Sequence, residues 1–309
     1  HDLSRFVAHQ YRIPFVSVPT AASSDGFTST VADMTWNGVK KTVAASAPLF
    51  VFADTDIFAK APKRLTAAGV SDILGKYIAL ADWKIASILS EEYYCAEVVN
   101  LETRAVRTVK DNLKEIAAGE EEACEKLMYA LVLSGLAMQM TGSSRPASGA
   151  EHHLVHLWDM EVVNGHLDAL HGEKVSGGTM LVLLEYKKIA DAIRRGTCKV
   201  HTCTEEDQEL LKETFGKKGI LGALEKENTP EPLDDVSTRE LSDALPRILK
   251  IIDALPAVTD MQEMMNTAGC VSRVRDIGLP GEVIEESLLL APYTRRRLSL
   301  LRLRKMLTY

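Results

Sequence analysis

GSSRPASGAEHHLVHLWDMEVV, residues 142–163, places three histidines within five positions, directly after a loop rich in glycine, serine and proline. On a helix, His152 and His156 are four residues apart and share one face, whereas His153 points roughly 100° away. Two of the three imidazoles can therefore meet at a single site, and we interpret His153 as structural. The stretch predicts a helix that carries either metal ligands or ordinary polar side chains.

Two further residues could complete a metal site. His171 in LHGEKV lies at the start of a later helical pattern, and Asp72 in LTAAGVSDILGKYIALADW follows a glycine near the start of an earlier one. With His152 they would supply two imidazoles and a carboxylate, which suits catalytic zinc with one position open for water or substrate. The spacing is long range, so the residues alone leave open a histidine pair with no metal role.

Other metal and catalytic motifs are absent. The helix carries H-x-x-x-H without the glutamate of the H-E-x-x-H metalloproteases. The segment CKVHTC (198–203) holds metal-capable side chains but has no second cluster to complete a site. We therefore expect no zinc site there.

The periodicity of apolar residues changes near Pro62. Before it, PFVSVP (14–19) and PLFVFADTDIF (48–58) predict buried strands, and Asn37-Gly38 between alternating runs predicts a hairpin. After it, leucine, alanine and methionine recur at helical spacing, and Ser237 with Glu240 predicts a capping box. We expect an α/β part over residues 1–61 and an all-helical domain over residues 62–309.

Composition limits the partners and the compartment. The chain has 309 residues and a formal net charge of −7, which argues against nucleic acid as a partner. Five scattered cysteines do not form a disulfide framework and favour a reducing, cytoplasmic setting. No apolar run approaches the roughly 18 to 20 residues that a membrane helix needs, so we expect no membrane insertion.

Both ends of the chain are distinctive. The pattern at His1 begins in mid-helix, from which we expect a truncated chain that lacks the glycine-rich turn for a dinucleotide and has no turnover by itself. At the other end, YTRRRLSLLRLRKMLTY (293–309) alternates leucines with basic residues. We favour a terminal helix that packs its leucines inward with the basic side chains outward, over a helix that lies on a membrane surface.

Four segments, taken in this order, resemble the sn-glycerol-1-phosphate dehydrogenases. They are PFVSVPTAASSDGFTS (14–29), AGVSDILGKYIALADW (68–83), SSRPASGAEHHLVH (143–156) and LHGEKV (170–175). That branch belongs to the superfamily of glycerol dehydrogenase, the iron-dependent alcohol dehydrogenases and dehydroquinate synthase. The resemblance implies a partial Rossmann-like nucleotide-binding domain followed by a dehydroquinate synthase-like helical metal-binding domain, and a homodimer.

The resemblance also implies roles for individual positions. Asp72, His152 and His171 match the metal ligands, with zinc the usual ion and nickel or iron as alternatives. Asp72, His156 and Asp25 match substrate-contacting residues, with Asp72 and His156 in the catalytic set. The positions that match the lining of the NAD(H) or NADP(H) site are Asp2, Thr20, Ala21, Ser23 and Ser29. Ala22 stands where the family often has proline, which predicts a slightly looser loop.

The implied reaction is the reversible reduction of dihydroxyacetone phosphate to sn-glycerol 1-phosphate, used in lipid synthesis. His156 is the expected proton relay. Arg145 is the first candidate for the phosphate and Lys76 the second, while a loop-fixing role for Arg145 stays open. The alternatives are glycerol dehydrogenase, a lyase of the dehydroquinate synthase type, and an inactive metal-binding fragment. The choice between NAD and NADP stays open.

Overall fold

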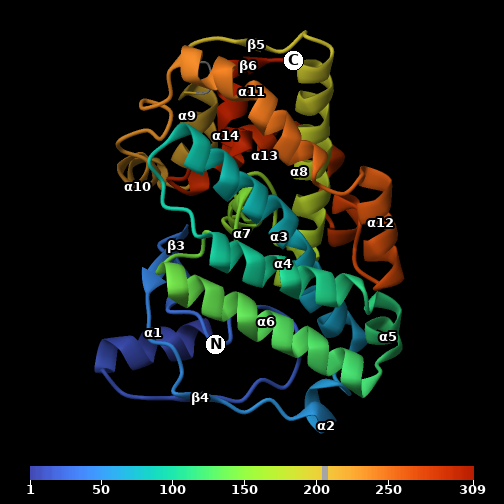
Figure 1. Cartoon of the computed structure of the whole chain (residues 1–309). Coiled ribbons are helices and arrows are strands. Elements are labelled where there is room, and N and C mark those ends of the chain that lie inside the picture. Colours follow the sequence, from blue (N-terminus) through green and yellow to red (C-terminus); the bar gives the residue numbers. More distant parts are fainter. Residues whose placement is uncertain (204–207) are drawn as a thin grey trace.

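Short strands and one helix make up the first part of the computed structural model, which describes residues 1–203 and 208–309. Its elements are α1 (Asp2–Tyr11), β1 (Val16–Ser17), β2 (Val31–Trp36), β3 (Val39–Ala44) and β4 (Phe50–Val51). β1 pairs in parallel with β4, and β2 pairs antiparallel with β3. Figure 1 shows α1 and β4 in blue near the bottom of the view and β3 at the left.

The hairpin expected at Asn37-Gly38 is confirmed. Its two strands pair without interruption from Val31 with Ala44 to Trp36 with Val39. Asn37 and Gly38 both have positive φ angles, 50° and 80°. A two-residue turn of this kind matches the twist of the flanking strands, and asparagine followed by glycine adopts it at the lowest cost.

The two strands predicted to be buried are largely exposed, and that prediction is wrong. Val16 and Phe50, which pair with each other, are 46% and 61% exposed. A parallel strand is buried on both faces only where helices cover both sides of its sheet. Here the sheet has two strands of two residues each, and nothing else in the described ranges pairs with it. The apolar side chains therefore face outward.

Helices dominate after Pro62, as the periodicity predicts, and the short helix α2 already begins at residue 55. The longer ones are α3 (Lys63–Leu89), α4 (Ala96–Lys110), α6 (Glu121–Thr141), α7 (Ala150–Asp159), α8 (His171–Arg194), α11 (Thr238–Asp253) and α12 (Val258–Thr267). The shorter ones are α2 (Thr55–Phe58), α5 (Leu113–Ala118), α9 (Gln208–Gly216), α10 (Leu221–Glu227), α13 (Ile284–Leu290) and α14 (Leu300–Leu303). The capping box of Ser237 and Glu240 opens α11, as predicted. The exact division at residues 61 and 62 stays a prediction.

Short 3-10 turns and one strand pair complete the chain. The turns are η1 (Val274–Ile277), η2 (Gly281–Val283), η3 (Ala291–Thr294) and η4 (Arg304–Met306). β5 (Lys199–Val200) pairs antiparallel with β6 (Leu307–Thr308), which fixes the C-terminal end to the segment after α8.

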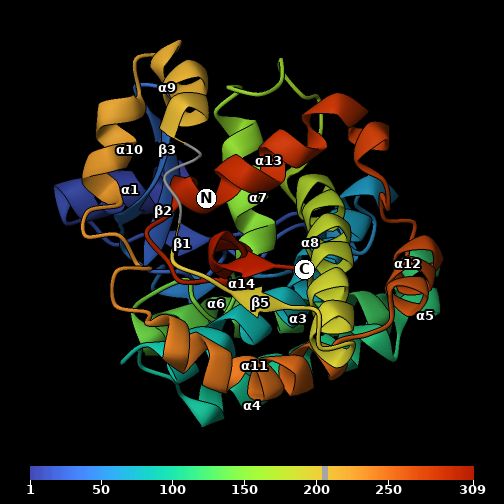
Figure 2. The ribbon, with the colours of Figure 1, turned by 90° about the horizontal axis from the view of Figure 1, so that it is seen from above.

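α3 runs through the centre of the helical part. Its sequence is apolar on nearly every side, as expected of a helix that is surrounded by other helices. It packs against α4, α6, α7, α8 and α11. Figure 2, seen from above, shows α7 beside α8 over this core. Residues far apart in the sequence are thereby brought to one place.

The C-terminal segment differs from the predicted terminal helix. Its leucines are buried as expected, at positions 298, 300, 301 and 303. The expectation that the basic residues face outward is wrong for Arg295 and Arg302, which are almost fully buried. Arg302 donates from Nε and Nη2 to Glu231 at 2.7 and 3.0 Å, so a carboxylate compensates its burial. None of the helices in the described ranges has the length and apolar character that crossing a membrane requires.

Candidate metal centre

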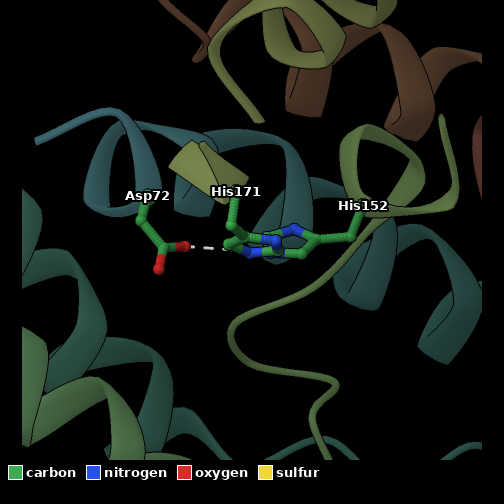
Figure 3. A group of neighbouring side chains, drawn as sticks. All are labelled: Asp72, His152 and His171. Atoms are coloured by element: carbon green, nitrogen blue, oxygen red, sulfur yellow. Dashed lines mark ion pairs between the residues drawn. The ribbon is translucent and has the colours of Figure 1, made fainter. Parts of the chain in front are cut away.

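Three side chains from three helices converge, as the sequence predicted. Asp72 comes from α3, His152 from α7 and His171 from the first turn of α8, and one potential ligand atom from each lies within 4.8 Å of the others. Figure 3 shows the carboxylate and the two rings pointing toward one another. His152 Nε2 is 3.7 Å from Asp72 Oδ1. Asp72 and His152 are buried, whereas His171 is exposed, so the site can be reached from solvent.

Two glycines allow the backbones around this site to touch. A Cβ atom on Gly172, next to His171, would lie 2.0 Å from the carbonyl oxygen of Ala68 in α3. A Cβ atom on Gly69 would lie 2.0 Å from the carbonyl oxygen of Ala22. Any larger residue would therefore push α8, or the loop before Asp25, away from α3. This close approach brings His171 and Asp25 to Asp72.

The orientation of His152 fits a metal ligand. Its Nδ1 is 2.7 Å from Oε1 of Glu151, which also accepts a hydrogen bond from the backbone N–H of Gly149. The Glu151 carboxylate therefore accepts a hydrogen bond from the Nδ1–H group of His152. In this tautomer Nε2, the atom that faces Asp72, has a free lone pair. A carboxylate behind a histidine in this manner is usual at metal sites. The donor set of two imidazoles and one carboxylate suits zinc, nickel or iron.

Lys76 is a buried cation beside Asp72. Its Nζ is 2.8 Å from Asp72 Oδ1 and 2.8 Å from Asp25 Oδ2, and the backbone N–H of Asp25 donates to Asp72 Oδ2 at 2.9 Å. Burial by itself raises the pKa of Asp72, but Lys76 and both histidines hold that pKa well below its usual range. Burial would lower the pKa of Lys76, yet Asp25 and Asp72 raise it above its usual value. The Lys76 ammonium thus faces two carboxylates, which leaves it poorly placed for a phosphate.

Ser134 and Glu102 extend this network and were missed by the sequence analysis. Ser134 Oγ is 2.9 Å from both Asp25 Oδ2 and Glu102 Oε1. A hydroxyl has one proton to donate, so one of the two carboxyl groups must supply the other. Burial raises the pKa of Glu102 to about 8, which identifies it as the protonated partner near neutral pH. The one available signal was a glutamate on the otherwise apolar face of α4, among Val98, Ala105, Val106 and Val109.

His156 lies one turn beyond His152 on α7 and is also buried. Its Nε2 is 3.3 Å from Nη2 of Arg295, which forms an ion pair with Asp33 at 2.8 Å. Burial and the neighbouring Arg295 hold the pKa of His156 well below its usual value, so the ring is neutral at physiological pH. His153, on the other face of the helix, is fully buried, and neither ring nitrogen has a partner among the described residues.

Arg145 has the contacts of a loop-fixing residue. Its Nε and Nη2 bind the carboxylate of Glu92 at 2.6 and 2.8 Å, and Nη2 also donates to the carbonyl of Leu298. The side chain is buried and its carboxylate partner is already in place. These contacts are those of the loop-fixing role left open from the sequence, while Arg145 Nη1 is buried without a partner among the described residues. Arg145 as the phosphate ligand stays a prediction.

The expected cofactor positions lie in the N-terminal part. Asp2 is the first residue of α1, and its Oδ1 pairs with Arg5 and accepts the backbone N–H of Asp33. Ser29 Oγ accepts the N–H of Val31, and Thr20, Ala21 and Ser23 lie between β1 and β2. Their role in binding a nicotinamide stays a prediction. CKVHTC contributes no residue to the one candidate metal group found in the described ranges.

Comparison with known proteins gives one family for the whole chain. Residues 1–62 match the family model described as iron-containing alcohol dehydrogenase. A protein named glycerol-1-phosphate dehydrogenase [NAD(P)+] from Geobacillus stearothermophilus is 36% identical over 289 residues, which is 93% of this chain and 64% of the relative. A protein of the same name from Methanosarcina mazei is 35% identical over 261 residues, covering 82% of this chain and 70% of the relative.

Solved structures confirm the expected fold class. Maleylacetate reductase from Agrobacterium tumefaciens matches with a TM-score of 0.55 at 13% identity, over 97% of this chain and 68% of that one. A 1,3-propanediol oxidoreductase matches with a TM-score of 0.55 at 17% identity, over 93% of this chain and 61% of that one. At these identities the likeness shows the fold alone. The curated relatives are more similar in sequence, at 35 to 36% identity, and the chain spans 64% of the length of the Geobacillus protein. The chain belongs to the glycerol-1-phosphate dehydrogenase family.

Proposed function

We propose that this chain carries the metal and substrate site of an NAD(P)H-dependent dehydrogenase that reversibly reduces dihydroxyacetone phosphate to sn-glycerol 1-phosphate for lipid synthesis. The observation that supports this most is the convergence of Asp72, His152 and His171 in a chain of this family. A glycerol dehydrogenase or a lyase of the dehydroquinate synthase type would use a similar ligand set. The curated relatives are named for the phosphorylated product, which favours the first activity.

Asp72, His152 and His171 would hold one divalent cation, with zinc preferred and nickel or iron as alternatives. When bound, the cation supplies Lewis-acid polarisation of a substrate carbonyl. Asp2, Thr20, Ala21, Ser23 and Ser29 would line the site of the reduced nicotinamide, a cofactor that would supply a hydride. The remaining work, which is to orient the substrate and to move a proton, belongs to the side chains around the centre.

Asp25 is placed to hold a substrate hydroxyl. Lys76 and Ser134 both contact its Oδ2, while Oδ1 makes no hydrogen bond to another described residue. The backbone N–H of Asp25 is fixed on Asp72, so the free oxygen keeps a set position beside the metal centre. An acceptor held this way can orient the terminal hydroxyl of a three-carbon substrate.

His156 is the proposed hydrogen-bond donor within the proton relay, acting as a neutral ring. A guanidinium can only donate, so the Nε2 atom that faces Arg295 must be the acceptor, and the proton of the neutral ring resides on Nδ1. Nδ1 is buried without a partner in the described part of the chain. The Nδ1–H group can therefore donate to the substrate oxygen on which charge develops, without the ring ever being an imidazolium.

Binding is the primary test, because it reports directly on the proposed metal and substrate site. Isothermal titration of the zinc-loaded protein with sn-glycerol 1-phosphate should give one site per chain, and a chelator should abolish it. NADH or NADPH oxidation with dihydroxyacetone phosphate, dihydroxyacetone and a dehydroquinate precursor is then compared in parallel. Metal-dependent binding of the dehydroquinate precursor in place of the glycerol phosphate would refute the proposal in favour of the lyase. Homodimerisation and a cytoplasmic location remain part of the proposal.

A further inference from the structure

Arginine side chains from two distant segments gather around α7. Arg145 belongs to the loop before α7, and Arg295, Arg297 and Arg302 belong to the C-terminal segment. All four contribute to lowering the pKa of the buried His153, after the effect of burial itself, so their charges lie close together. Arg145 and Arg302 each have a carboxylate in two-point contact, with Glu92 and Glu231. The other two are compensated less completely.

Arg297 has no ion pair within the described ranges. Its Nη1 donates to the carbonyl of Ser148 at 3.0 Å and its Nη2 to Ser144 Oγ at 2.8 Å, both neutral acceptors. Burial, together with the neighbouring Arg295 and Arg145, lowers the pKa of Arg297 to about 9. An anion near Arg297 would relieve the repulsion that it experiences from Arg295 and Arg145.

Arg295 is nearly buried, at 8% exposure, yet some of its N–H groups donate no hydrogen bond within the described chain. Its Nη2 serves both Asp33 Oδ1 and His156 Nε2, at 2.8 and 3.3 Å. Its Nε is buried without a partner, and Nη1 has no hydrogen bond to any other residue of the described chain. A guanidinium offers five N–H donors, and an unsatisfied buried donor on a charged group is costly. The missing acceptor is therefore one that the protein itself does not supply.

The position of Arg295 ties it to the candidate metal centre. It contacts His156, which lies on the same face of α7 as the ligand His152 and one turn away. The charge of His171, the third proposed ligand, contributes to lowering the pKa of Asp33, which is the ion-pair partner of Arg295. Lys40 of β3 adds positive charge near His156. One helical turn, about 5 Å, suits the separation between the carbonyl and the phosphate of a triose phosphate.

We propose that Arg295 binds the phosphate of the substrate while the other end of the same molecule lies at Asp72, His152 and His171, with Arg297 adding positive charge behind it. This inference rests on the proposed function and names the residue that distinguishes a phosphorylated substrate from its unphosphorylated analogue. Arg295 is then a specificity-determining residue. Of the candidates from the sequence, Lys76 faces two carboxylates and Arg145 already has one in two-point contact, although Arg145 Nη1 is also buried without a partner among the described residues.

The test compares Arg295→Met with Arg296→Met, since Arg296 is the adjacent, exposed arginine that donates only to the carbonyl of Pro230. Both zinc-loaded variants are titrated with sn-glycerol 1-phosphate and with glycerol. Arg295→Met should weaken glycerol 1-phosphate binding by roughly 10- to 100-fold and glycerol binding far less, because the hydrogen bonds to the charged phosphate are lost for the first ligand alone. Arg295→Lys should recover part of the loss, and Arg296→Met should match the wild type.

Cobalt binding, followed by its visible absorption, should be the same in all variants, which separates this result from damage to the metal site. An equal loss for both ligands, or no loss, would overturn the phosphate assignment. If Arg295→Met does not fold, the wild type decides: inorganic phosphate and glycerol should bind together, and mutual exclusion would overturn it. Failure of the wild type to bind glycerol 1-phosphate in a metal-dependent manner would instead contradict the proposed function.

Discussion

At the scale of single residues, Glu102 shows how a buried acid can be kept neutral. It occupies a core position on α4, and its Oε2 has no partner among the described residues. Burial and the neighbouring carboxylates Asp25 and Asp72 raise the pKa of Glu102, although Lys76 and Ser134 act in the opposite direction. The proton on Glu102 lets Ser134 donate to Asp25. The Asp25 carboxylate beside the candidate metal centre is thus oriented from α4.

The unfolding free energy of the metal-free protein should depend on pH because Glu102 is protonated in the folded state. The pKa of Glu102 is about 8 in the folded state and near 4.5 when unfolded, so the folded state binds the proton more tightly between those values. Stability contributed by Glu102 must therefore fall as pH rises through that window. We expect Glu102→Gln to become more stable relative to the wild type between pH 5 and 8, by on the order of 3 kcal/mol, measured by urea unfolding.

The matched control is Glu97→Gln, an exposed glutamate near the start of the same helix. Its stability difference from the wild type should not change over this pH range. Parallel pH profiles for Glu102→Gln and the wild type would show that Glu102 is ionised in the folded protein.

At the scale of elements, Asp82 joins four helices behind the candidate metal centre. Its Oδ2 accepts the N–H of Ala150 at the start of α7, and its Oδ1 accepts the hydroxyl of Tyr186 in α8 and the N–H of Leu300 in α14. Asp82 itself belongs to α3 and is fully buried, which raises its pKa to about 6. These bonds set where α7 begins, two residues before His152.

Asp82→Ala should therefore lower the free energy of unfolding by more than a typical substitution of a polar core residue does. It would leave the donors of Ala150, Tyr186 and Leu300 buried without an acceptor, at a cost of roughly 3 to 5 kcal/mol in unfolding free energy. Zinc affinity should fall as well, because the start of α7 is no longer fixed. Asp111→Ala, an exposed aspartate with one weak contact to Arg107 at 4.0 Å, is the control. Similar losses for both variants, in urea unfolding, would contradict this role for Asp82.

Local features could be predicted from the sequence, and features that depend on distant neighbours could not. The Asn37-Gly38 hairpin and the Ser237 cap depend on a few adjacent residues, and both are present. Burial of the strand at Val16 depends on strands and helices that must flank it, so periodicity alone overestimated it. The arginines of the tail were assigned outward because charged side chains are mostly exposed, and only their distant carboxylate partners make burial possible.

At the scale of the whole molecule, a cation at the candidate centre would link three helices that are distant in the sequence. Ligands from α3, α7 and α8 come together only in the folded state, so metal binding adds to folding stability. We expect zinc at 100 times its dissociation constant to add about 2.7 kcal/mol, a rise of a few degrees in the melting temperature.

His152→Ala should abolish this zinc-dependent rise in thermal unfolding experiments, whereas His166→Ala, at an exposed histidine of the loop after α7, should retain it. A full rise in His152→Ala would mean that zinc binds elsewhere. The two variants differ by one imidazole each, so loss of nonspecific zinc binding cannot account for a difference between them.

The loop of residues 160–170, which joins α7 to α8, has a consequence for how the chain can be divided. It separates His152 from His171 in the sequence, and its residues Gly165, His166 and Asp168 are exposed. Insertions and cuts are best tolerated in such exposed segments, while α8 keeps its packing against α3 and α7. Two separate polypeptides, ending and starting in this loop, would each carry part of the ligand set. Their association would rebuild the centre, which makes the chain suited to fragment complementation with metal binding as the signal.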